Sequence, residues 1–130
     1  MGASFCTVFE THVPEYGTLG SDHRALLRAM RRLDQLAADN GLIPLRAFES
    51  YDPADTADFL DEETQAGQPP VEWFAPAAGL AAVHGLLAFL DAHLDSLAGQ
   101  AQVAADLTGI ADELQAAQRA GVRFRFAVVM

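Results

Sequence analysis

Hydrophobic and polar residues alternate at both ends of the chain. Residues 3–10 are rich in Phe, Val and Thr, and their alternation predicts a β-strand. Residues 122–130 alternate in the same way, with Arg123 and Arg125 opposite the apolar side chains. Because a half-buried strand turns its apolar face to the core, we expect both arginines to lie in solvent.

Between these strands, apolar residues recur every three or four positions, which is the spacing of amphipathic helices. Helices are predicted over residues 21–41, 54–60, 76–97 and 102–120. Ser21 is the expected N-cap of the first helix, because its hydroxyl can accept a hydrogen bond from a first-turn amide. Asp106 and Glu113 fall beside the apolar stripe of the last helix, so we expect both on its outer face.

The helix predicted for residues 76–97 is apolar on almost every side. Such a helix is usually buried on more than one side, which favours a central place in the core. We expect its His84 to be buried and hydrogen-bonded rather than catalytic. Phe89 falls on the side away from the main leucine cluster, and that side is the alternative surface for contact with another chain.

Residues 42–51 are predicted to form a short extended segment, which Pro44 places at a sheet edge because it has no amide to donate. The order of elements predicts an α+β fold. We expect a small sheet of about three strands, formed by the N-terminal, middle and C-terminal strands. Three long helices and one short helix should pack mainly on one face of it. The 130 residues show no repeat or linker, so a single domain over 1–130 is predicted.

The net charge of −10 limits the classes of partner. Such a surface repels nucleic-acid backbones and anionic lipids, so neither nucleic acid nor membrane is expected to bind. The start of the chain lacks a secretion signal, and the longest apolar run is too short to span a bilayer. Cys6 is the only cysteine, which suits a reducing compartment. We therefore expect a cytoplasmic location.

Negative charge is concentrated between Asp52 and Glu72, where seven acids occur without a basic residue. A basic protein would be attracted to this segment. The candidate binding residues are Asp55, Asp58, Asp61, Glu62, Glu63, Glu72 and Trp73. Plainer explanations stay open: the acids can be a solvated face or pair with arginines of the first helix, and Trp73 can pack the next helix onto the core.

Residues suited to catalysis or metal binding are few and scattered. The four histidines lack the spacing that puts ligands on one helical face, so no metal site or cofactor is predicted. Cys6 lies within a strand, where side chains pack rather than react. The common nucleotide-binding, nucleophile-elbow and zinc-protease motifs do not occur. The sequence therefore favours a non-enzymatic protein, and no catalytic residue is assigned.

Three stretches carry a resemblance to known sequences: PLRAFESYDP at 44–53, PPVEWFAPAAGLAAVHGLL at 69–87 and GVRFRFAV at 121–128. They resemble a family of small acidic bacterial proteins that share the pattern PLxxF…EWFxPxxGLxxVxxLL. The resemblance implies a single-domain bacterial protein. No activity is known for that family, so it transfers no functional residue.

Three functions from different classes follow from the sequence. The leading hypothesis is a cytoplasmic bacterial protein that binds a basic protein through its acidic segment, as an immunity protein or antitoxin does. The alternative is a small-molecule-binding protein or enzyme with a pocket between sheet and helices, lined by Arg46, Tyr51, Trp73 and His84. A homodimer through the Phe89 side of the long helix is the third.

Overall fold

The computed structural model describes residues 3–51 and 71–129 of the chain. Its elements are β1 (Ser4–Val13), β2 (Gly17–Leu19), α1 (Arg24–Asp39), the 3-10 helix η1 (Leu45–Phe48), α3 (Pro76–Ala92), α4 (Gln100–Ala120) and β3 (Phe124–Val129). The fold is α+β, as predicted, whereas the helix predicted for residues 54–60 lies outside the described residues. Within the described part, no helix combines the length and apolar character needed to cross a membrane.

The sheet has three antiparallel strands in the order β2-β1-β3. β1 pairs with β3, starting with Ser4 opposite Val129, so the two predicted terminal strands are neighbours. The third strand, β2, returns from β1 as a hairpin, and no strand was predicted there. Glu15 and Gly17 have φ values of 80° and 73°, and they turn the chain back onto β1.

The middle strand predicted over residues 42–51 is wrong. After Pro44 the chain forms η1, in which Leu45 and Phe48 are both buried. These two side chains lie one 3-10 turn apart and therefore face the core together, whereas a strand would point them to opposite sides. Glu49 then makes a single parallel bridge to Phe126 of β3.

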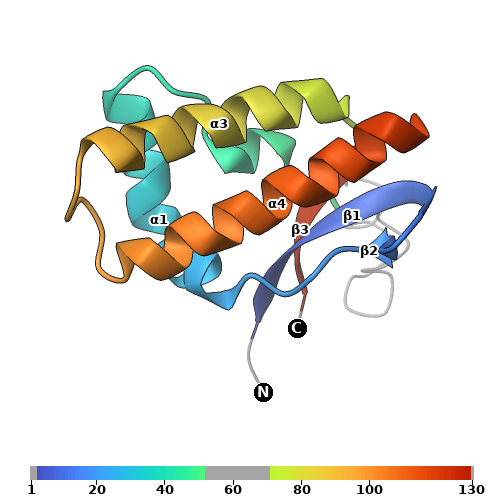
Figure 1. The fold of residues 1–130 in the computed structure, drawn as a ribbon, viewed down its shortest axis with the longest axis horizontal. Helices are drawn as coiled ribbons and strands as arrows, with labels where there is room; N and C mark the ends of the chain where they lie inside the picture. The colour runs from blue at the N-terminus through green and yellow to red at the C-terminus, as the bar shows by residue number, and fades with distance from the viewer. Residues whose placement is uncertain (1–2, 52–70, 130) are drawn as a thin grey trace, which may run out of the picture.

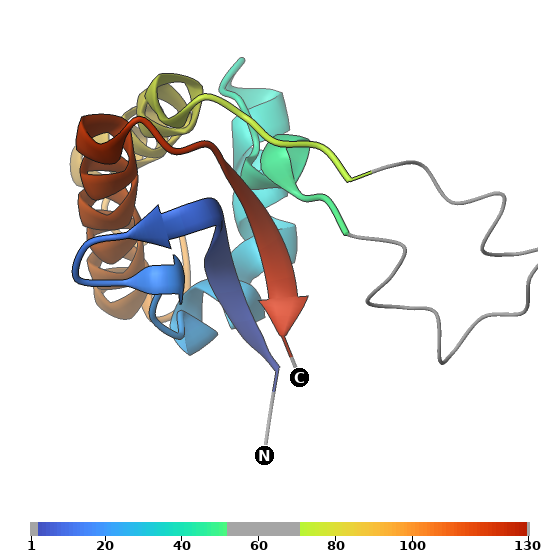
Figure 2. The ribbon, with the colours of Figure 1, turned by 90° about the vertical axis from the view of Figure 1, so that its right-hand side faces the viewer.

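The core lies between the sheet and the helices. β1 packs against α1 and α4, and α3 packs against α4. Figure 1 shows α3 and α4 running side by side, and Figure 2 shows α1 behind β1 and β3. The sheet contributes four fully buried aromatic rings: Phe5, Phe9, Phe124 and Phe126. Each buried ring stabilises the fold by about 2–3 kcal/mol, so these four rings contribute a large share of the core.

The start of α1 differs from the prediction. The helix begins after His23, which occupies the N-cap position without a side-chain cap, so Ser21 is not the cap. The first-turn amide of Leu26 instead donates to the carboxylate of Asp106 in α4, at 2.9 Å. The oxygen that caps α1 therefore comes from another helix, which ties the two helices together.

The long apolar helix is also shorter than predicted, since α3 ends at Ala92 rather than near Leu97. Asp95 has a φ of 65°, in the left-handed region, and the chain bends there towards α4. The prediction that His84 is buried is wrong. Its side chain is exposed, because the core-facing side of α3 is formed by other residues: Gly79, Leu80, Ala82, Val83, Leu86 and Leu90.

Candidate functional site

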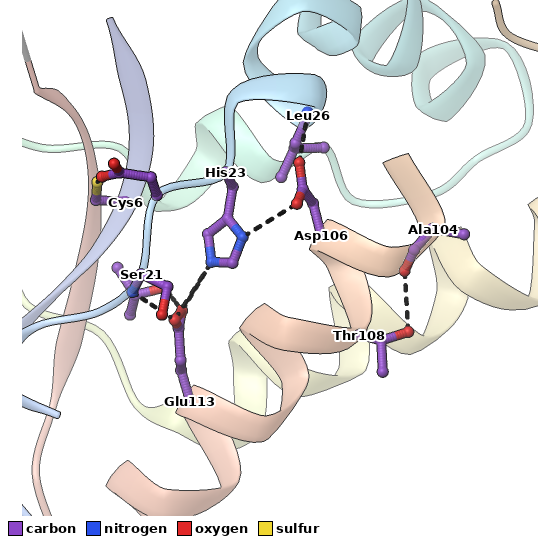
Figure 3. Close-up of polar contacts among 10 residues, drawn as sticks. Cys6, Ser21, His23, Leu26, Ala104, Asp106, Thr108 and Glu113 are labelled. Carbon is purple, nitrogen blue, oxygen red and sulfur yellow. Dashed lines mark hydrogen bonds and ion pairs between the residues drawn. The ribbon is translucent and has the colours of Figure 1, made fainter. Parts of the chain in front are cut away.

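A cluster of polar side chains is buried where β1, the start of α1 and α4 meet (Figure 3). It consists of Thr7, His23, Asp106 and Glu113 and is called the His23 cluster below. Nε2 of His23 lies 3.1 Å from Oε1 of Glu113, and Nδ1 lies 3.5 Å from Oδ1 of Asp106. The Thr7 hydroxyl donates to Oε1 of Glu113 at 2.9 Å, and the Ser21 amide donates to Oε2 at 3.0 Å. The Glu113 carboxylate thus joins α4 to β1 and to the segment that precedes α1.

The two carboxylates favour the charged form of His23. Burial lowers the pKa of this imidazole, but hydrogen bonds and charge interactions with Glu113 and Asp106 outweigh burial, so the pKa is raised above its usual 6.5. Both ring nitrogens then act as donors, one to each carboxylate. The cluster is therefore a buried ion pair that links α4 to the start of α1.

Two glycines make room for the cluster. A Cβ on Gly20 would lie 2.6 Å from Oε2 of Glu113, and a Cβ on Gly109 would lie 3.1 Å from Cε1 of His23. Any larger residue at position 20 would displace the carboxylate, because carbon and oxygen atoms do not approach so closely. The backbone around Gly20 is therefore part of the site.

The geometry of the cluster suits a structural role better than catalysis. His23 is 4% exposed and Glu113 is 1% exposed, so a substrate would not reach them without local opening. Cys6 is also buried, and burial, helped by the nearby charges of Asp22 and Glu113, raises the pKa of its thiol to about 11. The thiol therefore stays protonated at neutral pH and is a poor nucleophile. Among residues 3–51 and 71–129, no group of three or more His, Cys, Asp or Glu is arranged to hold a metal ion.

The sequence did not reveal this cluster. Glu113 was expected on the outer face of its helix and is instead buried, and Asp106 is partly buried. A signal was present, because Asp106, Gly109 and Glu113 follow one another at intervals of three and four and so share one face of α4. A glycine between two acids within a helix indicates that something approaches the helix closely there.

A second feature lies at the outer edge of β3, and we call it the sheet-edge anchor. The Ser50 amide donates to the Phe126 carbonyl at 3.1 Å, and Phe74 exchanges two backbone hydrogen bonds with Phe124. The Glu72 amide donates to Oγ of Ser50 at 2.8 Å. The residues on the two sides of segment 52–70 are thereby fixed to β3 and to each other.

The prediction that Arg125 faces solvent is wrong. It is 7% exposed, and its guanidinium carbon lies 5.2 Å from the ring centroid of Trp73, where a cation–π interaction is favourable. Nη1 of Arg125 also donates to the Ser50 carbonyl at 2.7 Å. The outer face of β3 is covered here by the sheet-edge anchor, which the alternation of residues along β3 could not indicate.

The predicted binding residues fall partly outside the described residues. Asp55, Asp58, Asp61, Glu62 and Glu63 lie there, so their side chains are not described. Glu72 is exposed, and Trp73 is partly buried against Arg125 at the end of the acidic segment. Phe74 packs on Phe48 just before the start of α3, with ring centroids 5.4 Å apart.

The residues of the alternative pocket are distributed over two helices, η1 and α3, and the two flanks of residues 52–70. Arg46 of η1 pairs with Asp34 of α1 at 3.2 Å and lines a cavity between these two helices. The Tyr51 hydroxyl donates to the Glu49 carboxylate and accepts the amide of Val128 at the sheet edge. His84 is exposed on α3. Neither Tyr51, Trp73 nor His84 belongs to the wall of the Arg46 cavity.

Comparison of the chain with known protein families, with curated proteins and with solved structures gives no match.

Proposed function

We propose that this chain is a non-enzymatic, cytoplasmic bacterial protein that binds a basic protein partner through its acidic segment, in the manner of an immunity protein or antitoxin. The observation that carries the proposal is the concentration of charge. Residues 52–70 contain six acids and no basic residue, so they supply −6 of the net charge of −10. A field of one sign on so short a segment attracts a basic partner and accelerates its encounter.

Three arginines, one on η1, one on β3 and one just before β3, are already engaged by other groups. Arg46 pairs with Asp34, and Arg123 pairs with Glu10. Arg125 binds the Ser50 carbonyl and lies over Trp73. Their existing contacts reduce their capacity to neutralise the acidic segment, which supports a basic group supplied by another molecule.

The sheet-edge anchor also suits a binding segment. The hydrogen bond from the Glu72 amide to Ser50 fixes the two flanks of residues 52–70 at one place on β3. A partner that contacts these flanks meets a preformed surface, so less of the interaction energy is spent on ordering it. Trp73, held by Arg125 at one flank, adds an aromatic side chain of the type that dominates many interfaces.

The proposal is tested with two variants of equal net charge. The first changes three acids of the segment to amides: Asp58→Asn, Asp61→Asn and Glu62→Gln. The matched control changes three exposed acids elsewhere: Glu15→Gln, Asp39→Asn and Asp112→Asn. Basic proteins captured from cell lysate by the wild type are identified, purified and titrated calorimetrically against each form.

We expect the segment variant to lose at least ten-fold in affinity and the control variant to lose less than three-fold. Equal affinity in both variants would contradict the proposal. Thermal unfolding tests whether the acids instead form ion pairs within the chain. If the segment paired with the arginines of α1, the segment variant would unfold at a lower temperature, whereas the proposal predicts an unchanged temperature.

One observation favours the second candidate, a small-molecule-binding protein. The cavity between α1 and η1 has a volume of about 650 Å³ and contains Arg46 and Asp34 in its wall. A ligand that binds only the folded state raises its unfolding temperature by mass action. A thermal-shift screen with metabolites tests this candidate, and loss of any shift in Arg46→Ala would place the ligand in that cavity.

A further inference from the structure

A groove with an apolar floor lies between the end of α3 and the start of α4. Its volume is about 690 Å³, and its wall includes Leu87, Leu90, Leu94, Ala101 and Ala104. Leu94 is 76% exposed, more than any other large apolar residue of the described chain. An exposed leucine beside further apolar surface indicates a place where another molecule can bind.

The groove is preformed by one side chain, Gln100. Its Nε2 donates to the carbonyls of Leu90 and His93, and its Oε1 accepts the amides of Ser96 and Leu97. These four hydrogen bonds fix the connection between α3 and α4. A preformed groove binds more tightly than one that must order first, because no conformational entropy is lost in forming it.

Two carboxylates mark the rim of this groove. Asp91 and Asp95 both line it and are exposed, and neither is in an ion pair within residues 3–51 and 71–129. They are four residues apart near the end of α3, and Leu94 lies between them in sequence. The groove therefore offers apolar contact and negative charge side by side.

We propose that the groove binds an amphipathic helix of a different protein, with apolar residues on Leu87 and Leu94 and Lys or Arg facing Asp91 and Asp95. A helix laid in a groove presents residues at intervals of three and four, which matches an apolar floor with charge along one rim. Charge complementarity selects a basic helix over an acidic one.

A second copy of this chain fits the groove poorly. A symmetric dimer through the groove would bring Asp91 and Asp95 of both copies into one interface, where like charges repel. The arginine-rich helix α1 cannot serve as the ligand, because its apolar face is already buried in its own core. A basic helix from another protein meets neither difficulty.

The inference is independent of the proposed function. The groove is at the C-terminal end of α3, while the sheet-edge anchor precedes its N-terminal end. A helix of 17 residues separates them by roughly 25 Å. Substitutions in the groove therefore leave the sheet-edge anchor unchanged.

The test uses a fluorescein-labelled leucine–lysine peptide of about 18 residues that forms an amphipathic helix. A scrambled peptide of identical composition is the control for charge alone. Fluorescence anisotropy with the full chain measures the affinity of each peptide. We expect the amphipathic peptide to bind at least ten-fold more tightly than the scrambled one.

Leu94→Ser should weaken binding of the amphipathic peptide by about ten-fold, because one buried leucine contact is lost. Ile43→Ser is the matched control, since Ile43 is 50% exposed and lies outside the groove, and we expect less than a two-fold change. Asp91→Asn with Asp95→Asn should weaken binding and flatten its salt dependence. Asn suits position 95, because it tolerates the left-handed backbone there.

Equal affinity of the wild type and Leu94→Ser would overturn the proposal. It would also fail if the acidic-segment variant lost the peptide while the groove variants kept it, because the peptide would then bind residues 52–70. Sedimentation provides a further test: a dimer of the wild type that dissociates in Leu94→Ser would show that a second copy occupies the groove. A monomer at high concentration supports the proposal.

Discussion

Replacing Glu113 by Gln removes the charge from the centre of the His23 cluster and changes its shape little. The two oxygens of Glu113 accept hydrogen bonds from the Thr7 hydroxyl, the Ser21 amide and Nε2 of His23. Gln has a single acceptor oxygen, and its NH₂ group would face at least one of these donors. The variant therefore keeps the packing of α4 but breaks the polar complementarity of the cluster.

The size of the effect follows from burial. Leaving a buried donor without an acceptor costs about 1–3 kcal/mol, and removing one partner of a buried ion pair costs about 3–5 kcal/mol. Asp106 still compensates part of the charge on His23, since its oxygen lies 3.5 Å from Nδ1. We therefore expect Glu113→Gln to lower the free energy of unfolding by about 3 kcal/mol.

The loss should depend on pH in a defined direction. The folded-state pKa of His23 is raised above 6.5, so its ion pair contributes fully below about pH 6.5 and is lost as pH rises through the folded pKa. One proton limits this slope to about 1.4 kcal/mol per pH unit. The difference between wild type and variant should thus be largest near pH 6 and smaller near pH 8.

Urea unfolding followed by the fluorescence of Trp73, the only tryptophan, measures both effects. The pKa of the Cys6 thiol is raised from 9.0 to about 11 in the folded protein, so stability also falls as pH rises above 9.0. Measurements below pH 8 avoid this effect. Asp112→Asn, at the exposed neighbouring position on α4, is the control, with an expected change within about 0.5 kcal/mol. A loss below about 1 kcal/mol for Glu113→Gln, or a difference that grows with pH, would refute this account of the cluster.

Two further predictions concern α3 and the cap of α1. Gly79→Ala should destabilise the protein by about 1–3 kcal/mol, because its Cβ would overlap with Cζ of Phe124. Gly85→Ala, whose Cβ would make only ordinary contact, should stabilise it by about 0.5–1 kcal/mol. Equal effects in thermal unfolding would show that the close packing on Phe124 is absent. Asp106→Ala should lower the free energy of unfolding in urea by about 1–2 kcal/mol, because the Leu26 amide loses its cap and His23 loses a charge partner. An unchanged free energy of unfolding would contradict this role of Asp106.

Local patterns in the sequence were sufficient to locate the terminal strands and to indicate that α1, α3 and α4 exist, but not where α1 begins or α3 ends. The hairpin strand β2 was missed, because it depends on a positive φ at Glu15, a residue with no special preference for that conformation. The short 3-10 helix η1 was predicted as a strand. Leu45 and Phe48 are both buried, and an apolar segment this short fits either structure.

The sites depended on contacts between distant parts of the chain. His23 and Glu113 are 90 residues apart in sequence and meet only when α4 packs against the start of α1. Arg125 was placed in solvent by the alternation along β3, but the covering residues, Ser50 and Trp73, belong to other segments. Periodicity indicates which face of an element is apolar, and it does not indicate which partner reaches the opposite face.

The central functional claim is that a basic protein binds at the acidic segment. Hydrogen–deuterium exchange of the full chain, free and bound to its purified basic partner, tests it most directly. We predict slower exchange on binding for peptides covering residues 49–74, which include the sheet-edge anchor. Identical exchange of these peptides in the free and bound states, under conditions of full complex formation, would contradict the account.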